Sequence, residues 1–278
     1  MERVILHIGL RKTASTFLQH NVFPYIPEVL YKQDSDLLLS YNVSSGKKIL
    51  LISNEDIPGW PYYLDGVHKS FFDQFKYSIN LIKKIFKNPK IIVCFREPGS
   101  FIYSNYKQYL HEGGVMKWED FFSLEDGKGL LNKEDYFFSK YVTYLFDNFN
   151  EEDICIYEFE NFKNNNYETI IGLVRFIMPD HQNFEINLKN KRRSNPAVNY
   201  RFENTLIKLN EWNKYFIKKK GIRLQIRLFG KLINPRVLCQ YIFPKFLKKI
   251  PERDLQSIHD YYREDWNFAQ KIIHKKLR

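Results

Sequence analysis

Cationic and hydroxyl side chains gather in a short loop near the start of the chain. The loop begins at Gly9, directly after a short apolar run typical of a strand, and leads into a stretch typical of a helix. A strand, a tight loop and a helix N-terminus place several backbone N–H groups around one anion. Lys12 adds a full positive charge, and hydroxyl donors follow at Thr13, Ser15 and Thr16. The sequence therefore predicts a cradle for a phosphate or sulfate group.

A second interpretation of the same loop is an ordinary strand-to-helix turn in which a serine or threonine caps the helix. The loop is not a Walker A motif, because that motif requires a glycine five residues before its Gly-Lys pair. Leu6 and Arg11 occupy those two glycine positions here. On this stretch alone, the anion cradle and the capped turn both remain open.

A second cationic position follows the clearest strand of the sequence. The segment Lys90–Phe95 contains an unbroken apolar run, which is typical of a strand buried on both faces of a parallel sheet. Arg96 comes directly after it, at the carboxyl end of the strand, where an arginine is well placed to bind an anion. Ser104 follows eight residues later, inside the next expected helix, and can face the same point. Taken alone, Arg-x-Pro after a strand is also compatible with a surface turn.

Strands and helices alternate along the rest of the chain. Further strands are expected at Lys48–Ser53 and Asp153–Glu158, helices at Ser70–Phe86, Tyr136–Phe149, Thr169–Ile177 and Arg253–Leu277, and a polar, turn-rich segment at Tyr31–Gly46. This alternation predicts an α/β fold with an open parallel sheet and helices on both faces. Ligands of such sheets bind beyond the carboxyl ends of the strands. The polar residues that follow the strands are therefore the candidate site.

Size and composition narrow the class of protein. The 278 residues fit a single domain, 1–278, with a basic, mostly helical embellishment at about 205–250. The net charge of +11 favours anionic ligands such as nucleotides, acidic glycans, nucleic acid or an anionic membrane surface. Three well-separated cysteines, with no cluster of metal-ligand spacing, indicate no metal site and a reducing, cytoplasmic setting. We expect neither a signal peptide nor a membrane-spanning run.

The stretch 214–249 differs in composition from the rest of the chain. It contains eleven Lys and Arg residues and no Asp or Glu, with apolar residues interleaved. Such a pattern is compatible with an amphipathic element that contacts an anionic glycan, or an anionic membrane peripherally at its inner face. A solvated basic helical face explains the same pattern without any partner.

Together, the two cationic positions resemble the motifs of the PAPS-dependent sulfotransferases. PAPS is 3′-phosphoadenosine 5′-phosphosulfate, and PAP is its product. The motif Gly9-x-x-Lys12-Thr13-x-Ser15-Thr16 is similar to the loop that holds the 5′-phosphosulfate in that family, and Arg96-x-Pro98 with Ser104 is similar to the motif that holds the 3′-phosphate. The resemblance implies a P-loop-like three-layer sandwich, here with a helical C-terminal extension.

Three weaker features support the resemblance. They are Tyr157-Glu158 after a late strand, a basic loop at 191–193, and Tyr261-Tyr262 in the last helix. The resemblance implies that the following residues bind the donor: Arg11, Lys12, Thr13, Ala14, Ser15, Thr16, Phe17, Arg96, Ser104, Lys191, Arg192 and Arg193.

The chain also departs from the family pattern in its first loop. Arg11 stands where the family often has a proline or a small residue, and Phe17 stands where some members stack a tryptophan on adenine. Ala14 stands where glycine is usual. We therefore expect the loop not to rely on the positive φ that glycine adopts easily.

Sulfuryl transfer to a hydroxyl needs fixed cations at the leaving phosphate and a general base for the acceptor. Lys12 is the natural partner of the bridging oxygen, which joins the 5′-phosphate of PAPS to the sulfuryl group. Cytosolic members of the family use a histidine after the second strand and glycan-modifying members a glutamate near it, and here Glu55 follows that strand. Glu55 and Lys12 are therefore the predicted catalytic residues. The alternative is that Asn54–Asp56 is a solvent-exposed turn with an Asx role.

The resulting hypothesis is a sulfotransferase that moves a sulfuryl group from PAPS to a hydroxyl on a carbohydrate, either a glycan or a glycolipid. The candidate acceptor contacts are Trp60, Tyr62 and His111. Nucleic acid is not an expected partner. Two alternatives remain open: a P-loop-type kinase of a small molecule, and a non-catalytic protein that binds polyanions or a membrane surface.

Overall fold

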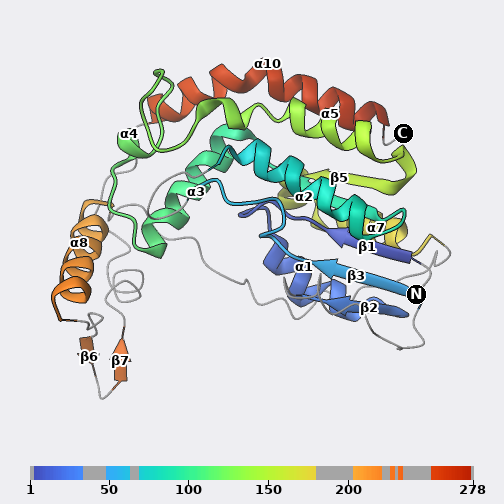
Figure 1. Cartoon of the computed structure of the whole chain (residues 1–278), viewed down its shortest axis with the longest axis horizontal. Helices are drawn as coiled ribbons and strands as arrows, with labels where there is room; N and C mark the ends of the chain where they lie inside the picture. Colours follow the sequence, from blue (N-terminus) through green and yellow to red (C-terminus); the bar gives the residue numbers. More distant parts are fainter. Residues whose placement is uncertain are drawn as a thin grey trace.

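Five parallel strands form the centre of the protein in this computed structural model (Figure 1). They are β1 (Arg3–His7), β2 (Val29–Lys32), β3 (Ile49–Ser53), β4 (Lys90–Phe95) and β5 (Ile154–Glu158). Their order in the sheet is β2-β3-β1-β4-β5, and every pair is parallel. The structure describes residues 3–33, 48–62, 69–179, 203–220, 226–228, 231–233 and 252–276. The predicted open parallel sheet is confirmed.

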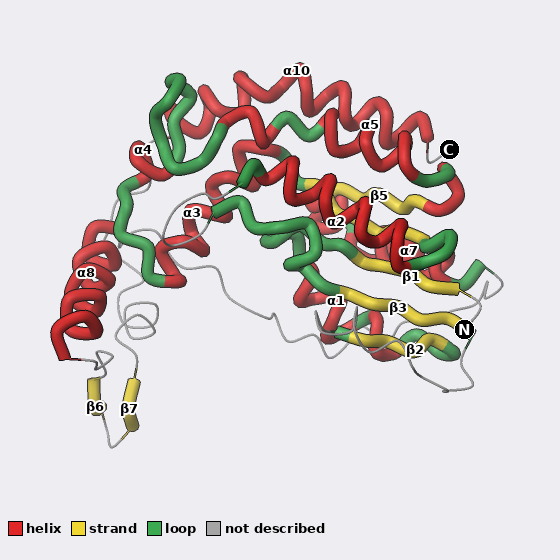
Figure 2. Tube along the Cα trace, viewed as in Figure 1, coloured by secondary structure: helices red, strands yellow, loops and turns green. Residues whose placement is uncertain are grey.

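Helices cover both faces of the sheet (Figures 1 and 2). One face packs on α2 (Phe71–Ile85), α3 (Pro98–Glu112), α5 (Ser139–Asn148) and α10 (Glu252–Lys276), and the other packs on α1 (Ser15–Asn21) and α7 (Asn166–Ile177). Successive residues of β3 divide between the two cores: Leu50 and Ile52 face the first, and Leu51 faces the second. This double burial explains the unbroken apolar runs of the sequence.

The remaining elements are short or lie beyond the sheet. They are η1 (Phe23–Tyr25), α4 (Trp118–Phe121), η3 (Lys133–Tyr136), η4 (Glu151–Asp153), α6 (Phe159–Asn164), α8 (Glu203–Lys220), β6 (Ile226–Leu228) and β7 (Lys231–Ile233). Strands β6 and β7 form an antiparallel pair inside the basic stretch 214–249. The other residues of 221–249 lie outside the described part of the chain, so a membrane or glycan contact there stays a prediction.

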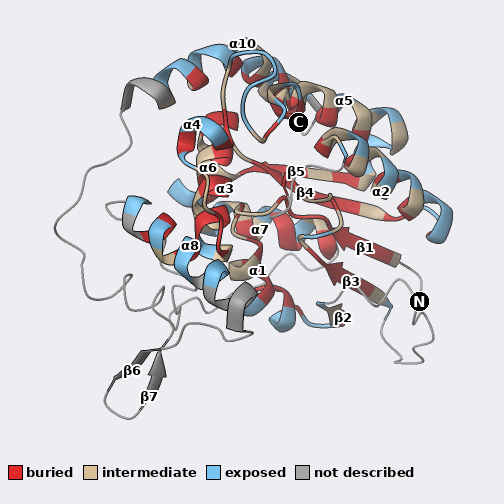
Figure 3. Cartoon of the chain, turned by 60° about the vertical axis from the view of Figure 1, so that its left-hand side comes forward, coloured by how far each residue is buried: buried red, intermediate tan, exposed pale blue. Residues whose placement is uncertain are grey.

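The closing helix α10 confirms the amphipathic pattern predicted for Arg253–Leu277. Ile258, Tyr262 and Trp266 are buried on one side of it, while its outer side is exposed (Figure 3). Within the described residues, the helices are all too short or too polar to cross a membrane.

Candidate active site

The loop between β1 and α1 has an unusual backbone. Lys12 and Ala14 both adopt positive φ values, 67° and 66°. The expectation that Ala14 does not use such a conformation is therefore wrong. A left-handed backbone at a residue with a Cβ costs about 1–2 kcal/mol, so packing from elsewhere must hold the loop in place.

The hydroxyl groups of the loop do not cap α1. The N-cap residue of this helix is Ala14, which makes no side-chain cap. Thr13 Oγ1 instead donates a hydrogen bond to the carbonyl of Leu10. Ser15 Oγ is buried and makes no hydrogen bond within the described residues. The interpretation of this stretch as a turn with a Ser or Thr cap is therefore not what the structure contains.

Gly9 allows the loop to fold back on itself. A Cβ at this position would lie 2.1 Å from Ser15 Oγ and 3.1 Å from His7 Cε1. His7 cannot retreat, because it is fully buried between Ser53 and Tyr157, at 2.7 and 3.3 Å. Burial also lowers the pKa of His7 to about 3, so this histidine is a neutral structural residue at physiological pH.

Substitution of Gly9 by alanine is expected to destabilise the protein by about 1–3 kcal/mol, because the added methyl group overpacks the loop. Urea denaturation followed by circular dichroism measures the change. Gly172→Ala is the matched control: a Cβ there meets nothing within 4 Å, so the helix should gain up to about 1 kcal/mol. Equal stability of the Gly9 variant and the wild type would contradict the close approach.

Arg96, at the carboxyl end of β4, contacts the β1–α1 loop directly. Its Nη1 donates a hydrogen bond to the carbonyl of Lys12, at 3.1 Å. Its guanidinium lies 4.3 Å from the centre of the Phe159 ring, and its Nε is buried without a partner among the described residues. The two cationic positions, 84 residues apart in sequence, thus meet at one rim of the sheet.

The last turns of α3 also reach this rim, which was not predicted. Lys12 Nζ donates to Gln108 Oε1 at 3.2 Å. Gln108 in turn donates to Glu112 Oε1 at 2.9 Å, and Arg11 Nη2 lies 3.2 Å from the same oxygen. The available signal is the spacing of Ser104, Gln108 and Glu112, which places three polar side chains on one face of a helix.

Arg11 and the segment after β3 form the other side of the site. The guanidinium of Arg11 lies 3.7 Å from the centre of the Trp60 ring, a cation–π contact. Tyr62 is buried, and its hydroxyl donates a hydrogen bond to Glu112 Oε2 at 3.1 Å. This bond restrains the position of the Glu112 carboxylate. His111, the third predicted acceptor contact, is exposed in the last turn of α3.

Glu55 is half-buried, and the positive charges of Arg11 and Lys12 both act on its carboxyl group. Burial raises the pKa of its carboxyl group, and the charge of Arg11 counteracts that increase, as does Lys12 to a smaller extent. The pKa of Lys12 is lowered, mainly by burial. The Asx turn of this segment belongs to Asn54, whose Oδ1 accepts from the backbone N–H of Asp56 at 2.7 Å.

The other predicted donor contacts divide into three groups. Thr16 is half-buried in α1, and Phe17 packs edge-to-face on Phe162 with ring centres 5.6 Å apart. Ser104 is buried in α3. The basic residues at 191–193 lie outside the described part of the chain.

Three buried polar side-chain atoms at the rim have the chemistry of an anion-binding site. In the described residues, the buried side-chain atoms without a hydrogen-bond partner include Arg11 Nη1, Ser15 Oγ and Arg96 Nε. Such atoms are rare in folded proteins, because each one loses its hydration without compensation. All three can donate, and two belong to cations. This donor set fits an anionic oxygen ligand, such as the phosphate and sulfate groups of PAPS.

A solved sulfotransferase structure has a similar arrangement of elements. A sulfotransferase from Alicyclobacillus acidocaldarius superposes with a TM-score of 0.50 and 11% identity, over 78% of this chain and 92% of that one. The chain has the sulfotransferase fold. The mouse sulfotransferase SULT7A1 complexed with PAP has a TM-score of 0.45 and 12% identity, over 98% of this chain and 88% of that one. No protein-family model matches the chain, nor does any curated protein sequence.

In this sulfotransferase fold, side chains of α10 contact residues at the rim of the sheet that carries the candidate site. Glu158, at the end of β5, is buried and accepts a hydrogen bond from Gln270 Nε2 at 2.6 Å; His274 Nε2 lies 2.8 Å from its other oxygen. Glu97, next to Arg96, caps α3 and lies 2.8 Å from His259 Nδ1. The last helix thus restrains the ends of two strands beside the candidate site.

Proposed function

We propose that the protein is a sulfotransferase that uses PAPS to sulfate a hydroxyl group of a carbohydrate. The observation that carries the proposal is the meeting of the two cationic loops through Arg96 Nη1 and the Lys12 carbonyl. Around it lie buried donor atoms of Arg11, Ser15 and Arg96 that have no hydrogen-bond partner among the residues that the structure describes. Two phosphate-bearing ends of one nucleotide need two cationic loops at one rim. The sulfotransferase fold supports the same function.

The proposed donor site uses the loop after β1 for the 5′-phosphosulfate and the end of β4 for the 3′-phosphate. Ser104 assists Arg96, and Phe17 contacts the adenine. The residues at 191–193 complete the proposed 3′-phosphate site. Bound PAPS supplies the activated sulfuryl group.

The proposed chemistry assigns one role to each catalytic residue. Lys12 stabilises the negative charge that develops on the bridging oxygen as its bond to sulfur breaks. Glu55 accepts the proton of the acceptor hydroxyl as that oxygen bonds to sulfur. The raised pKa of Glu55 makes it a stronger base than an exposed carboxylate. PAP then leaves from the cationic rim.

The proposed acceptor side comprises Trp60, Tyr62 and His111. Trp60 and Arg11 form an aromatic and cationic pair beside Glu55, and Tyr62 holds Glu112 in place. A carbohydrate acceptor is supported by the glutamate base and by the net charge of +11, which favours acidic glycans. A cytoplasmic location, with peripheral membrane contact through 214–249, belongs to the same proposal.

A comparison of nucleotides in thermal denaturation tests the proposal. PAP should raise the melting temperature, because a ligand present at 100 times its Kd stabilises the folded state by about 2.7 kcal/mol. ATP with Mg²⁺ should not. The reverse result would favour the small-molecule kinase. Transfer of radiolabel from PAPS to a panel of glycans then identifies the acceptor.

A deletion separates the proposal from the non-catalytic alternative. Removal of 214–249 should leave PAP binding intact if the nucleotide binds at the rim. Loss of all anion binding in that variant, with its folded spectrum retained, would favour a polyanion- or membrane-binding protein.

A further inference from the structure

Glu112, the last residue of α3, is bonded to several side chains at the rim. Its Oε1 accepts hydrogen bonds from Gln108 Nε2 at 2.9 Å and from Arg11 Nη2 at 3.2 Å. Its Oε2 accepts a hydrogen bond from the hydroxyl of Tyr62 at 3.1 Å. Both carboxylate oxygens are therefore held by groups from α3, from the loop after β1 and from the segment after β3.

Gln108 connects this carboxylate to Lys12. A glutamine amide has a donor end and an acceptor end. Because Nε2 donates to Glu112, Oε1 faces Lys12 and accepts a hydrogen bond from its Nζ at 3.2 Å. An amide turned the other way round would present N–H groups to the ammonium group. The carboxylate of Glu112 thus determines which end of the amide Lys12 meets.

Lys12 is held at two points by distant segments. Its main-chain carbonyl accepts a hydrogen bond from Arg96 Nη1, and its side chain donates one to Gln108. An ammonium group has three N–H donors, so two of them remain for the oxygens of an anion. A lysine side chain that is fixed before the anion arrives loses less conformational entropy on binding. The residues that orient it therefore affect affinity without touching the ligand.

The place of Glu112 in α3 is unfavourable for the helix itself. The carboxyl end of a helix carries a partial negative charge, so an acidic side chain there destabilises it. The side chains of Glu112 and Arg11 are only 22% and 13% exposed, so their pairing also costs hydration. A carboxylate that served the helix would stand at its N-terminus, as Glu97 does. The contacts of Glu112 with the binding groups of the rim account for its position.

We propose that Glu112 is a positioning residue of the anion site, which holds the Lys12 ammonium group through the Gln108 amide and holds the Arg11 guanidinium directly. Only the identity of the anion rests on the proposed function. Charge alone predicts the opposite effect of this residue. A carboxylate beside a cationic site repels an anion, so a Glu112 that acted only through its charge would weaken anion binding.

Two conservative variants separate reach from charge in titration calorimetry with PAP. Glu112→Asp keeps the charge but withdraws both oxygens by one methylene group, and it should weaken PAP binding about 3- to 10-fold. Glu112→Gln keeps the reach, and its carbonyl oxygen can accept from Gln108 and Arg11. It should bind PAP at least as tightly as the wild type, because a negative charge is removed. Thermal melting establishes that each variant is folded at the temperature of the titration.

A substitution of Gln108 tests the link to Lys12. Gln108→Met should also weaken PAP binding, because the ammonium group loses its acceptor. The double variant Gln108→Met/Glu112→Asp should lose less than the product of the two single losses, since both changes break one chain of contacts. Glu168→Asp is the matched control and should resemble the wild type: Glu168 is exposed in the first turn of α7, on the other face of the sheet.

Unchanged or tighter PAP binding in Glu112→Asp would overturn the positioning role, and losses that multiply in the double variant would overturn the link through Gln108. The proposed function would survive either result. If the wild type does not bind PAP, the proposed function fails, and inorganic pyrophosphate replaces PAP in the same titrations. Pyrophosphate binding that weakens in Glu112→Asp but not in Glu112→Gln would support the positioning role. Equal affinity in both variants and the wild type, or no binding by the wild type, would exclude it.

Discussion

Lys12→Ala and Arg96→Ala are each expected to weaken PAP binding by about 10- to 100-fold in calorimetry. Each removes a charge-assisted hydrogen bond to a phosphate, worth about 1.5–3 kcal/mol. Arg96→Ala also removes the bond from Nη1 to the Lys12 carbonyl, which restrains a loop residue of positive φ. Sulfuryl transfer by Lys12→Ala should fall further, by about 10²–10³ at saturating donor, because the charge on the bridging oxygen loses its partner.

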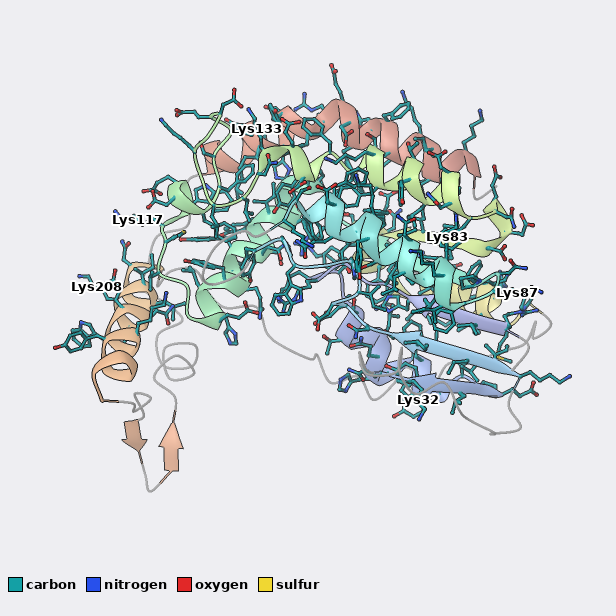
Figure 4. The ribbon with its side chains drawn as sticks, in the orientation of Figure 1. Lys32, Lys83, Lys87, Lys117, Lys133 and Lys208 are labelled. Atoms are coloured by element: carbon teal, nitrogen blue, oxygen red, sulfur yellow. The ribbon has the colours of Figure 1, made fainter. Side chains whose placement is uncertain are left out.

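Two exposed cations provide controls of the same chemical type. Lys87 lies in the segment between α2 and β4 (Figure 4), and Arg175 lies in the last turn of α7. Lys87→Ala and Arg175→Ala should bind PAP like the wild type. Unchanged PAP affinity in both Lys12→Ala and Arg96→Ala would refute the assignment of the rim as the nucleotide site.

The strands that were predicted correctly are those buried on both faces. Ile91–Phe95 is apolar at every position, and each of these residues is buried. β2 was not predicted, since Tyr31 and Lys32 were assigned to a polar, turn-rich segment. It is an edge strand in which only Val29 is fully buried, so its sequence carries no continuous apolar run. α6 was also missed, because a six-residue helix contains too few turns to show a period.

The cationic loops could be predicted because each directly follows a strand, and parallel strands end at one rim. The roles of Gln108 and Glu112 could not be predicted. Their contacts with Lys12 and Arg11 join residues 96 and 101 positions apart, and depend on how α3 crosses the first loop. The positive φ of Ala14 has a similar origin. Local preference argues against it, and contacts from distant segments stabilise the loop nevertheless.

Glu55→Gln is expected to leave PAP binding nearly unchanged and to reduce transfer by about 10²–10⁴. Glutamine keeps the size of the side chain but cannot accept the proton of the acceptor hydroxyl. The pH profile provides a second readout. Burial raises the pKa of Glu55, so below that pKa the carboxyl is protonated and inactive as a base. The rate of wild-type transfer should therefore increase as the pH rises through the raised pKa, and the Gln variant should lack this limb.

Asp56→Asn is the matched control for the base, because Asp56 is the adjacent carboxylate and is exposed. Its contact with Asn54 uses the backbone N–H and survives the substitution. Transfer should remain near the wild-type level in Asp56→Asn. Its acidic limb should be retained but move to lower pH, because the negative charge of Asp56 contributes to the raised pKa of Glu55. If Asp56→Asn loses transfer while Glu55→Gln keeps it, the base is Asp56 rather than Glu55. If both variants remain active, neither carboxylate removes the proton, and only the donor side of the proposed mechanism stands.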